Sequence, residues 1–314
     1  MNPKLALLEG DALLFVTAMI WGFAFVAQRV GMESLGPFTF NGVRYLIGAL
    51  SLVPLFLFRR AKAGARPPSA SPAVGSSSFA RNFGPPLLAG GAMFFGSTLQ
   101  QVGIVSTTAS NAAFITSLYV VLVPFLAALF GKKVLGIDWA ASLVAVAGLW
   151  LITMQHGLTI ATGDAFVLAC AFFWALHIIV ISRYASTYDP IALAIGQFTI
   201  SGVLSLAIAL PFERISLEGL HGALIPLLYS GLGSSGIAFT LQIFGQRKTK
   251  ASHASIIMSL EGLFGAIGGI LLLGEPATAR ILAGGSLMIL ATMLPQILDG
   301  AKALLRRLGP GGSS

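Results

Sequence analysis

The residues of this chain that could do chemistry are polar and aromatic side chains set inside long apolar runs. Eight of them stand out: Trp21, Arg44, Gln100, Tyr119, Trp174, His177, Gln242 and Glu261. Polar groups inside a bilayer are costly and usually mark a pathway for a solute or an ion. The sequence contains no nucleophile elbow, no H-E-x-x-H pair and no Walker lysine. We therefore expect a binding protein that is not an enzyme and that uses neither a metal nor a cofactor.

The uncharged members of this set offer different contacts to a solute. The flat faces and indole N–H groups of Trp21 and Trp174 suit an amphipathic organic molecule, and packing of large side chains is the alternative. The amides of Gln100 and Gln242 can donate and accept, so they could recognise a polar group, or they could join helices by hydrogen bonds. His177 stands one turn after Trp174 and either shares its face or is a hydrogen-bonded packing residue.

The two ionisable members, Arg44 and Glu261, carry the sharpest hypotheses. The guanidinium of Arg44 could bind a carboxylate or phosphate of a substrate, pair with Glu261, or extend to the membrane interface. Glu261 lies near the middle of its apolar run, and burial disfavours the charged form of a carboxyl group. Glu261 is therefore a candidate for a group that binds and releases a proton; a neutral or paired glutamate between helices is the alternative.

The elements that must position these residues are membrane-spanning helices. Of the 314 residues, 56% are hydrophobic and only 10% are charged, whereas soluble domains carry about 25% charged residues. Spans of roughly 20 apolar residues are expected at 11–30, 38–58, 84–105, 109–130, 135–154, 163–182, 190–211, 221–245, 251–273 and 278–298. The fold class is therefore an all-α membrane protein with ten transmembrane helices. The segment 59–83, rich in Pro, Ser, Ala and Gly, is predicted to be disordered, and 299–314 is predicted to be a flexible basic tail.

An internal repeat organises these helices into two halves, 10–155 and 163–298. The sequence Gly-Asp-Ala occurs at 10–12 and again at 163–165. The segments 98–118 and 240–260 align without gaps, with 11 identities in 21 positions. Each half holds five helices, an odd number, so the second half must enter the membrane from the opposite side. Inverted repeats are typical of alternating-access transporters, whose binding sites lie between the repeats.

The repeat also pairs the candidate residues. Trp21 corresponds to Trp174, Gln100 to Gln242, and Tyr119 to Glu261, while Arg44 corresponds to a glutamine in the second half. Equivalent positions in inverted repeats face the same interface. We therefore expect the paired residues to line one central void.

The distribution of basic residues predicts the orientation. Fifteen of the 19 Lys and Arg residues fall on one side of this arrangement and three on the other, namely Arg29, Arg214 and Arg280, while Arg44 lies within a helix. Cytoplasmic loops carry the excess of Lys and Arg. We therefore expect a bacterial cytoplasmic (inner) membrane protein with both termini and the 59–83 segment in the cytoplasm. The net charge of +8 follows from this orientation and does not indicate a nucleic-acid partner.

Two glycine-rich motifs point to packing. The run 231–236 matches the dinucleotide fingerprint G-x-G-x-x-G, but that fingerprint needs a preceding strand and this one lies inside an apolar span. Gly262, Gly265, Ala266 and Gly269 place small residues on one helical face, which predicts a close-packed helix–helix contact.

Three segments resemble the EamA-type members of the drug/metabolite transporter superfamily. They are residues 107–124, the Ser-Leu-Glu at 259–261 and the Leu-Leu-Gly-Glu-Pro at 272–276, and Trp21 in the first helix also fits. The resemblance covers about residues 10–298. It implies ten helices in two EamA repeats and transport of metabolites or amino acids, often outward.

The chain departs from the family pattern at two places. Gly262 stands where the family often has proline, and Gly131 is followed by Lys132 rather than glutamate. These departures leave the substrate and the coupling mechanism open. We predict a secondary transporter that moves a small organic metabolite, an amino acid or similar, across the lipid bilayer by alternating access, in the export direction. An intramembrane enzyme acting on lipid and a channel are the alternatives, while proton coupling and a homodimer stay open.

Overall fold

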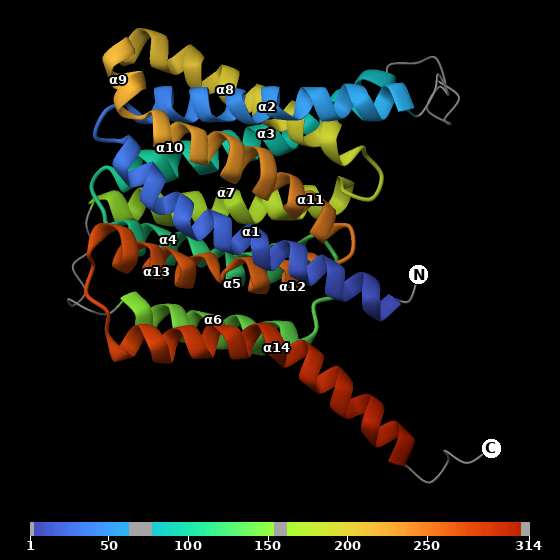
Figure 1. Ribbon diagram of the computed structural model, residues 1–314. Helices are drawn as coiled ribbons and strands as arrows, with labels where there is room; N and C mark the ends of the chain where they lie inside the picture. Colours follow the sequence, from blue (N-terminus) through green and yellow to red (C-terminus); the bar gives the residue numbers. More distant parts are fainter. Residues whose placement is uncertain (1–2, 63–76, 154–161, 309–314) are drawn as a thin grey trace.

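The computed structural model describes residues 3–62, 77–153 and 162–308, and every secondary-structure element in these ranges is a helix (Figure 1). The first half contains α1 (Pro3–Gly31), α2 (Pro37–Lys62), α3 (Ser77–Ile104), α4 (Ala109–Ser117), α5 (Tyr119–Leu129) and α6 (Gly136–Thr153). The second half contains α7 (Thr162–Tyr184), α8 (Pro190–Phe212), α9 (Leu217–Gly222), α10 (Leu224–Leu228), the π-helix η1 (Tyr229–Phe239), α11 (Thr240–Gln246), α12 (Ala251–Met258), α13 (Glu261–Leu273) and α14 (Ala279–Leu308).

The predicted all-helical membrane fold is confirmed in its main feature. Seven helical segments within the described ranges are long and apolar enough to cross a membrane: Leu5–Gly31, Pro37–Lys62, Ala109–Leu129, Thr162–Tyr184, Pro190–Phe212, Leu224–Gln246 and Ala251–Leu273. Two shorter apolar helices, Gly136–Leu151 and Ala279–Pro295, lie in α6 and α14. The chain is therefore a multi-pass membrane protein, and the exact number of ten spans stays a prediction.

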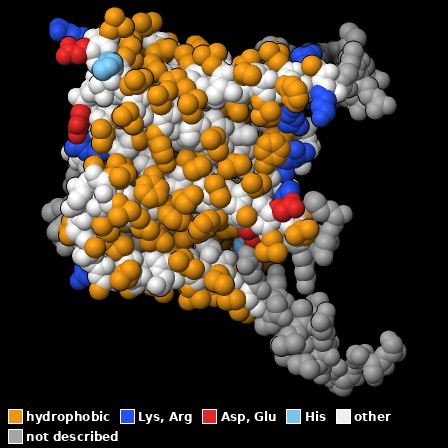
Figure 2. Space-filling model, viewed as in Figure 1, with side chains coloured by type: hydrophobic (Ala, Val, Ile, Leu, Met, Phe, Trp, Pro, Cys, Tyr) orange, Lys and Arg blue, Asp and Glu red, His pale blue; other side chains and the backbone are white. Residues whose placement is uncertain are grey.

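The helices lie side by side and the chain runs back and forth between two ends of the bundle (Figure 1). The start of α1 and the end of α14 lie at the same end, which we call the N-terminal end; the opposite one is the far end (Figure 1). Figure 2 shows hydrophobic side chains across the middle of the visible face, with Lys and Arg gathered at its edges. This distribution is the one expected where lipid covers the middle of a protein.

The contacts between helices repeat when the two halves are exchanged. The packing of α3 on α7 recurs as α11 and η1 on α1, and the packing of α12 and α13 on α1 recurs as α4 and α5 on α7. The pairs α2–α8 and α6–α14 map onto themselves, and the pair α4–α13 recurs as α12–α5. In Figure 1, α1 runs away from the N-terminal end whereas its counterpart α7 runs towards it. The two halves are thus related as inverted repeats.

Proline and acidic side chains fix where the helices α2 and α8 begin. Asp189 accepts hydrogen bonds from the backbone N–H groups of Ile191 and Ala192, and Pro190 opens α8. This arrangement satisfies donors that have no partner within the helix. The first turn of α2 is capped from α8: the Glu213 carboxylate accepts hydrogen bonds from the backbone N–H groups of Phe38 and Thr39 at 2.9 and 2.7 Å. The same contact therefore ties the two halves together.

The prediction of disorder or flexibility is partly wrong for two regions. α2 continues through Lys62 and α3 begins at Ser77, so both ends of the 59–83 segment are helical, while residues 63–76 lie outside the described part of the chain. α14 likewise continues to Leu308, whereas a flexible tail was expected from 299. Lys and Arg are good helix formers, and positive charge stabilises the C-terminal end of a helix. The basic residues Arg59, Arg60 and Lys62 therefore favour the extension of α2 at its C-terminal end.

Three predicted spans are less regular than expected. The 109–130 span divides into α4 and α5 at Leu118, the 251–273 span divides into α12 and α13 at Ser259 and Leu260, and the 221–245 span contains η1. At both divisions the backbone hydrogen bonds join residues three apart: Leu118 N–H donates to Ile115 C=O, and Leu260 N–H donates to Ile257 C=O, each at 3.2 Å. Short tightened turns and π-helical segments within helices often occur at functional positions.

The two glycine motifs pack closely against neighbouring helices. A Cβ atom on Gly231, in the fingerprint-like run, would lie 2.7 Å from the Ile47 side chain, and one on Gly265 would lie 2.5 Å from the Ala113 Cβ atom. The run 231–236 lies within η1, not after a strand, so it lacks the setting of a dinucleotide site. The predicted seam on α13 meets α4.

Candidate solute-binding chamber

All eight residues singled out in the sequence lie around one cavity between the two halves, which we call the chamber. They come from α1, α2, α3, α5, α7, α11 and α13: Trp21, Arg44, Gln100, Tyr119, Trp174, His177, Gln242 and Glu261. The chamber has a volume of about 40 Å³. A water molecule needs at least about 10–15 Å³ of such space, so the chamber holds a few water molecules and not an amino acid. A solute would therefore require the chamber to widen.

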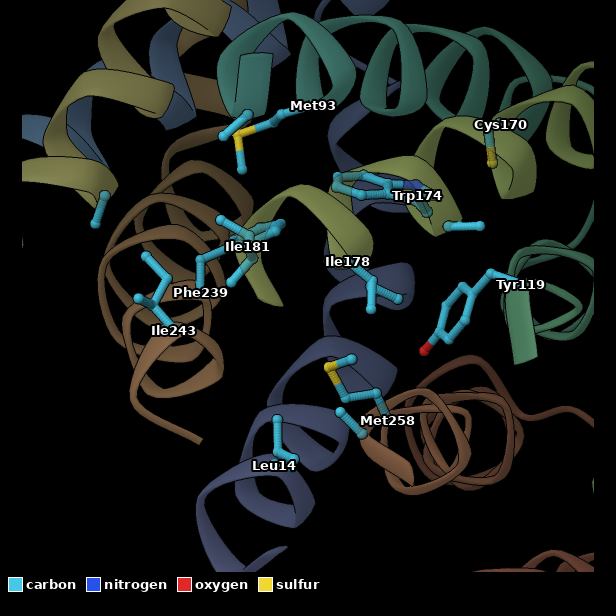
Figure 3. Packing of buried hydrophobic residues seen from close by; sticks show 14 of the residues in the cluster. Leu14, Met93, Tyr119, Cys170, Trp174, Ile178, Ile181, Phe239, Ile243 and Met258 are labelled. Atoms are coloured by element: carbon cyan, nitrogen blue, oxygen red, sulfur yellow. The ribbon is translucent and has the colours of Figure 1, made fainter. Parts of the chain in front are cut away.

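Phe239 joins the two tryptophans into an aromatic wall. Its ring centroid lies 4.5 Å from that of Trp21 and 5.7 Å from that of Trp174. Figure 3 shows Trp174, Phe239 and Tyr119 arriving from different helices around this interior. The indole N–H groups are already bonded: Trp21 donates to Ser234 C=O at 3.3 Å, and Trp174 donates to Gln100 Oε1 at 2.8 Å. The ring faces, rather than the expected indole N–H groups, are therefore free to contact a solute.

Phe239 was missed by the sequence analysis. It is the last residue of η1, directly before the aligned segment 240–260, and its equivalent in the first half is Ser97. Because the two positions differ in type, the repeat gave no signal. An aromatic residue at the edge of the aligned segment was the one indication available.

The two equivalent glutamines differ in how they are bonded. Gln100 Oε1 accepts the indole hydrogen bond, whereas neither side-chain polar atom of Gln242 has a hydrogen-bond partner although the side chain is fully buried. Buried polar atoms almost always have partners in native proteins. The amide of Gln242 therefore faces the chamber as an available donor and acceptor.

His177 shows both of the properties considered for it. Its Nε2 atom lies 2.9 Å from Gln197 Oε1, and its ring meets the edge of Trp174 with centroids 5.7 Å apart at 88°. Its Nδ1 atom has no partner. The side chain is thus held by a hydrogen bond and still lines the chamber.

Arg44 is buried without a carboxylate partner in the part of the chain that the structure describes. Its Nη2 atom donates to the Tyr45 hydroxyl at 3.0 Å, its Cζ atom lies 4.6 Å from the Tyr45 ring centroid, and its Nε atom has no partner. With 3% of its surface exposed, it neither pairs with Glu261 nor reaches the interface. Placing a cation at the centre of a bilayer costs at least about 2.5–3.5 kcal/mol, and a cation–π contact offsets about 1–2 kcal/mol.

Tyr119 and Glu261 occupy equivalent positions at the two helix divisions. Tyr119 is the first residue of α5 and Glu261 is the first residue of α13. The Tyr119 hydroxyl and the Glu261 Oε1 atom are buried and have no hydrogen-bond partner. The divisions therefore present one hydroxyl and one carboxyl group to the chamber, each beside a tightened turn.

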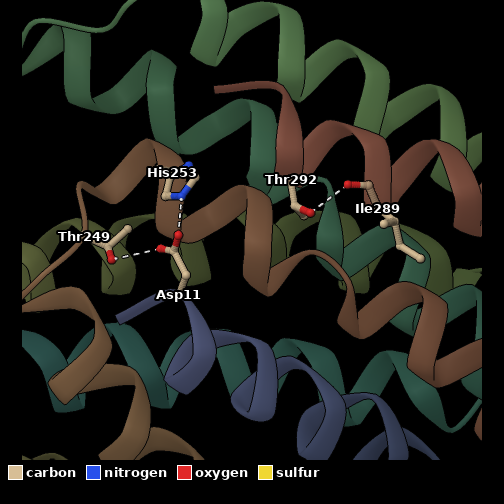
Figure 4. A network of polar contacts seen from close by, with 5 residues as sticks. All are labelled: Asp11, Thr249, His253, Ile289 and Thr292. Carbon is tan, nitrogen blue, oxygen red and sulfur yellow. Dashed lines mark hydrogen bonds and ion pairs between the residues drawn. The ribbon is translucent and has the colours of Figure 1, made fainter. Parts of the chain in front are cut away.

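At the N-terminal end, α1 closes against α11 and α12 through Asp11 (Figure 4). Asp11 Oδ1 accepts from the Thr249 hydroxyl at 3.4 Å, and Asp11 Oδ2 lies 3.2 Å from His253 Nε2. Beside it the backbones approach closely, since a Cβ atom on Gly10 would lie 3.2 Å from the Gly245 carbonyl oxygen. We call this contact the N-terminal closure.

At the far end, α7 closes against α3 through the equivalent residues. Asp164 Oδ1 accepts from the Thr107 hydroxyl at 2.6 Å, and a Cβ atom on Gly163 would lie 2.3 Å from the Gly103 carbonyl oxygen. Asp164 is equivalent to Asp11 in the repeat, as Thr107 is to Thr249. The sequence analysis did not select these residues, although their repetition near span ends was a usable signal. We call this contact the far closure.

This combination of features defines a class of protein. An aromatic and polar chamber lies between two inverted repeats of membrane helices, and equivalent hydrogen bonds join the halves at both ends of the bundle. Inverted repeats with a central site between them are typical of secondary transporters. The comparison with known proteins agrees: the model of the EamA-like transporter family matches residues 8–154 and again 161–295. The chain belongs to this family of transporters, as its sequence motifs had suggested.

Individual relatives are transporters as well. An uncharacterized transporter of Archaeoglobus fulgidus is 32% identical over 288 residues, which cover 91% of this chain and 85% of that protein. The threonine/homoserine exporter RhtA of Escherichia coli is 27% identical over 173 residues, covering 52% of this chain and 56% of the exporter. One solved crystal structure shares the fold, with a TM-score of 0.73 and 16% sequence identity. The match covers 96% of this chain and 98% of the chain in that structure.

Proposed function

We propose that this protein exports a small organic metabolite that carries a carboxylate, such as an amino acid, across the bacterial cytoplasmic membrane. The observation that carries this proposal is the buried guanidinium of Arg44 on the wall of the chamber, which has no carboxylate partner among the described residues. A planar guanidinium binds a carboxylate through two parallel hydrogen bonds. The name of the related threonine/homoserine exporter supports a substrate of this type.

The other chamber residues have complementary roles in this proposal. The faces of Trp21, Trp174 and Phe239 contact the apolar part of the substrate, and the free amide of Gln242 bonds its polar substituents. Since no second cation lines the chamber among the described residues, the carboxylate orients the substrate towards Arg44. The same site would reject a substrate without an anionic group, because Arg44 would stay unpaired.

Alternating access follows in our proposal from breaking one closure at a time. Ten spans with both termini in the cytoplasm place the N-terminal closure inside and the far closure outside. A chamber of about 40 Å³ must widen to admit a substrate, and the tightened turns and η1 lie where the helices would bend. Glu261, at one of these turns, is the group that we propose to bind and release a proton in each cycle.

A channel and an intramembrane lipid-acting enzyme fit less well. The binding residues of this chain surround a central chamber between two inverted repeats, an arrangement that favours a carrier over a channel. An enzyme needs clustered catalytic groups, and the described residues contain no group of three or more His, Cys, Asp or Glu side chains placed to hold a metal ion. The carrier is therefore the function that we test first.

The test uses the full chain in liposomes. Vesicles loaded with unlabelled L-threonine or L-homoserine, and with a panel of other amino acids, are diluted into trace labelled solute. A carrier accumulates label transiently by counterflow and saturates, whereas a channel does neither. Loss of counterflow for carboxylate-bearing solutes in Arg44→Gln, with the protein folded, supports the assigned site. Counterflow that is unchanged in Arg44→Gln would refute it.

A further inference from the structure

A second hollow lies on the opposite face of α7 from the chamber. It has a volume of about 1020 Å³ and runs from the middle of the bundle to the N-terminal end. Its floor is formed by Leu176, Ile179 and Val180 of α7, whereas Trp174 and His177 of the same helix face the chamber. The hollow is therefore separate from the substrate site, and we call it the α7 groove.

The α7 groove is apolar at depth and basic at its rim. Leu88 of α3, Ala127 of α5 and Phe130, directly after α5, form its apolar walls. Uncharged polar side chains line the part near the N-terminal end: Ser182, Tyr184, Ser186, Thr187, Thr249 and Ser252. Four exposed cations surround its mouth: Lys132, Lys133, Arg183 and Lys250. No acidic side chain lines the groove, and none of the four cations forms an ion pair with a carboxylate in the described ranges. Its occupant must therefore have an apolar body and an anionic head.

The fold does not require this charge. α5 and α13 are equivalent helices, and each is followed by a glycine in the left-handed conformation: Gly131 with φ 73° stands two residues after α5, and Gly274 with φ 70° directly after α13. The next residue is Lys132 in the first half and Glu275 in the second. Membrane orientation explains why cations are frequent at this end, but not why four cations from three separate segments converge on one apolar hollow.

We propose that the α7 groove binds an anionic phospholipid of the adjacent leaflet. The phosphate lies among Lys132, Lys133, Arg183 and Lys250, and an acyl chain follows the face of α7 between α3 and α5. Basic pockets between membrane helices are known to hold anionic lipid headgroups. From Leu176 to Tyr184 the helix rises about 12 Å, enough for the upper part of an acyl chain. The occupied groove would brace the helix that carries Trp174 and His177.

The test measures lipid binding to the purified full chain in detergent by native mass spectrometry, with phosphatidylglycerol and phosphatidylcholine as probes. We expect phosphatidylglycerol to bind at least tenfold more tightly. Each cation near an anionic headgroup contributes about 1 kcal/mol, a factor of about five, so Lys132→Gln with Arg183→Gln should weaken binding of phosphatidylglycerol about 25-fold. Arg59→Gln with Arg60→Gln is the matched control, because these exposed cations lie at the same end of the bundle and do not line the groove. The control should change binding less than twofold.

Three results would overturn the proposal. They are equal affinity for the two lipids, equal losses in the groove variant and the control, and full displacement of the lipid by inorganic phosphate, which would mean a simple anion site. If the groove variant is not recovered folded, lipid binding to the unaltered protein is measured at increasing salt concentration. The preference for phosphatidylglycerol must shrink as the ionic strength rises. The measurement needs no transport, so its outcome is independent of that of the counterflow test.

Discussion

The two closures make opposite predictions about which end of the chamber opens. Asp11→Ala removes the acceptor that holds α1 to Thr249 and His253, and Asp164→Ala removes the acceptor for Thr107. A hydrogen bond to a charged group contributes about 1.5–3 kcal/mol, so each change should favour opening at its own end by about 10- to 150-fold. The Thr107 contact, at 2.6 Å, is shorter than the 3.4 Å Thr249 contact. Asp11 also holds His253 at 3.2 Å, so the two variants should give shifts of similar size in opposite directions.

The assay follows the labelling of one cysteine in the chamber. Cys170 is the single cysteine, so a Cys170→Ala background can carry Ser234→Cys on the chamber wall. An impermeant thiol reagent is applied to vesicles of each orientation. Asp11→Ala should speed labelling from the N-terminal end and slow it from the far end, while Asp164→Ala does the reverse.

The double variant gives the sharpest outcome. The two substitutions shift the same equilibrium in opposite directions, so their effects should largely cancel. In the variant with both Asp11→Ala and Asp164→Ala, the ratio of the two labelling rates should return towards that of the protein without either substitution. Glu9→Ala is the control: it removes only an exposed pair with Lys248, which contributes about 1 kcal/mol or less. If both single variants speed labelling from the same end, or if neither changes the rates while the protein stays folded, these contacts are not gates.

Three further results are expected. Arg44→Gln should weaken the binding of carboxylate-bearing substrates about 10- to 150-fold, because a charged hydrogen-bonded pair is lost. The change in tryptophan fluorescence on adding substrate measures this binding. Equal weakening for an uncharged analogue would contradict the role of Arg44. Glu261→Gln mimics the protonated carboxyl group, so substrate exchange in liposomes should survive while accumulation driven by a pH gradient is lost; an unchanged gradient response would place proton coupling elsewhere. Gly265→Val forces a side chain against the Ala113 Cβ atom and should cost about 1–3 kcal/mol in thermal unfolding, whereas Gly91→Ala, with no atom within 4 Å of the added Cβ, should cost much less.

Much of the chamber could be predicted because the repeat supplies spatial information that one sequence normally lacks. Equivalent residues of inverted repeats face the same interface, and this alone brings Trp21 and Trp174, or Gln100 and Gln242, to one cavity. The helices themselves follow from apolar length. Both the repeat and the apolar length of each helix can be read directly from the sequence.

The remaining features depend on contacts between helices that are far apart in sequence. The division before Tyr119 occurs without a proline or glycine at Leu118, so no local signal marks it. The indole of Trp174 could not be known to bond Gln100, because that depends on the rotation of α7 against α3. The absence of an ion pair between Arg44 and Glu261 could not be predicted either, because it depends on how α2 and α13 are placed relative to each other.

The places where the symmetry of the halves fails indicate where direction and coupling are built in. The backbone contacts are equivalent: each half contributes an aspartate, a threonine and a pair of close glycines to the closures. The chemistry is not equivalent. Glu261 occupies the position that Tyr119 has in the first half, and Arg44 the position that the neutral Gln197 has in the second half. A carrier with identical halves would treat the two sides of the membrane alike, so any difference between its inward- and outward-open states must come from such unmatched pairs. Exchange of Tyr119 and Glu261 between the halves should therefore keep the fold and alter the coupling of transport to the proton gradient.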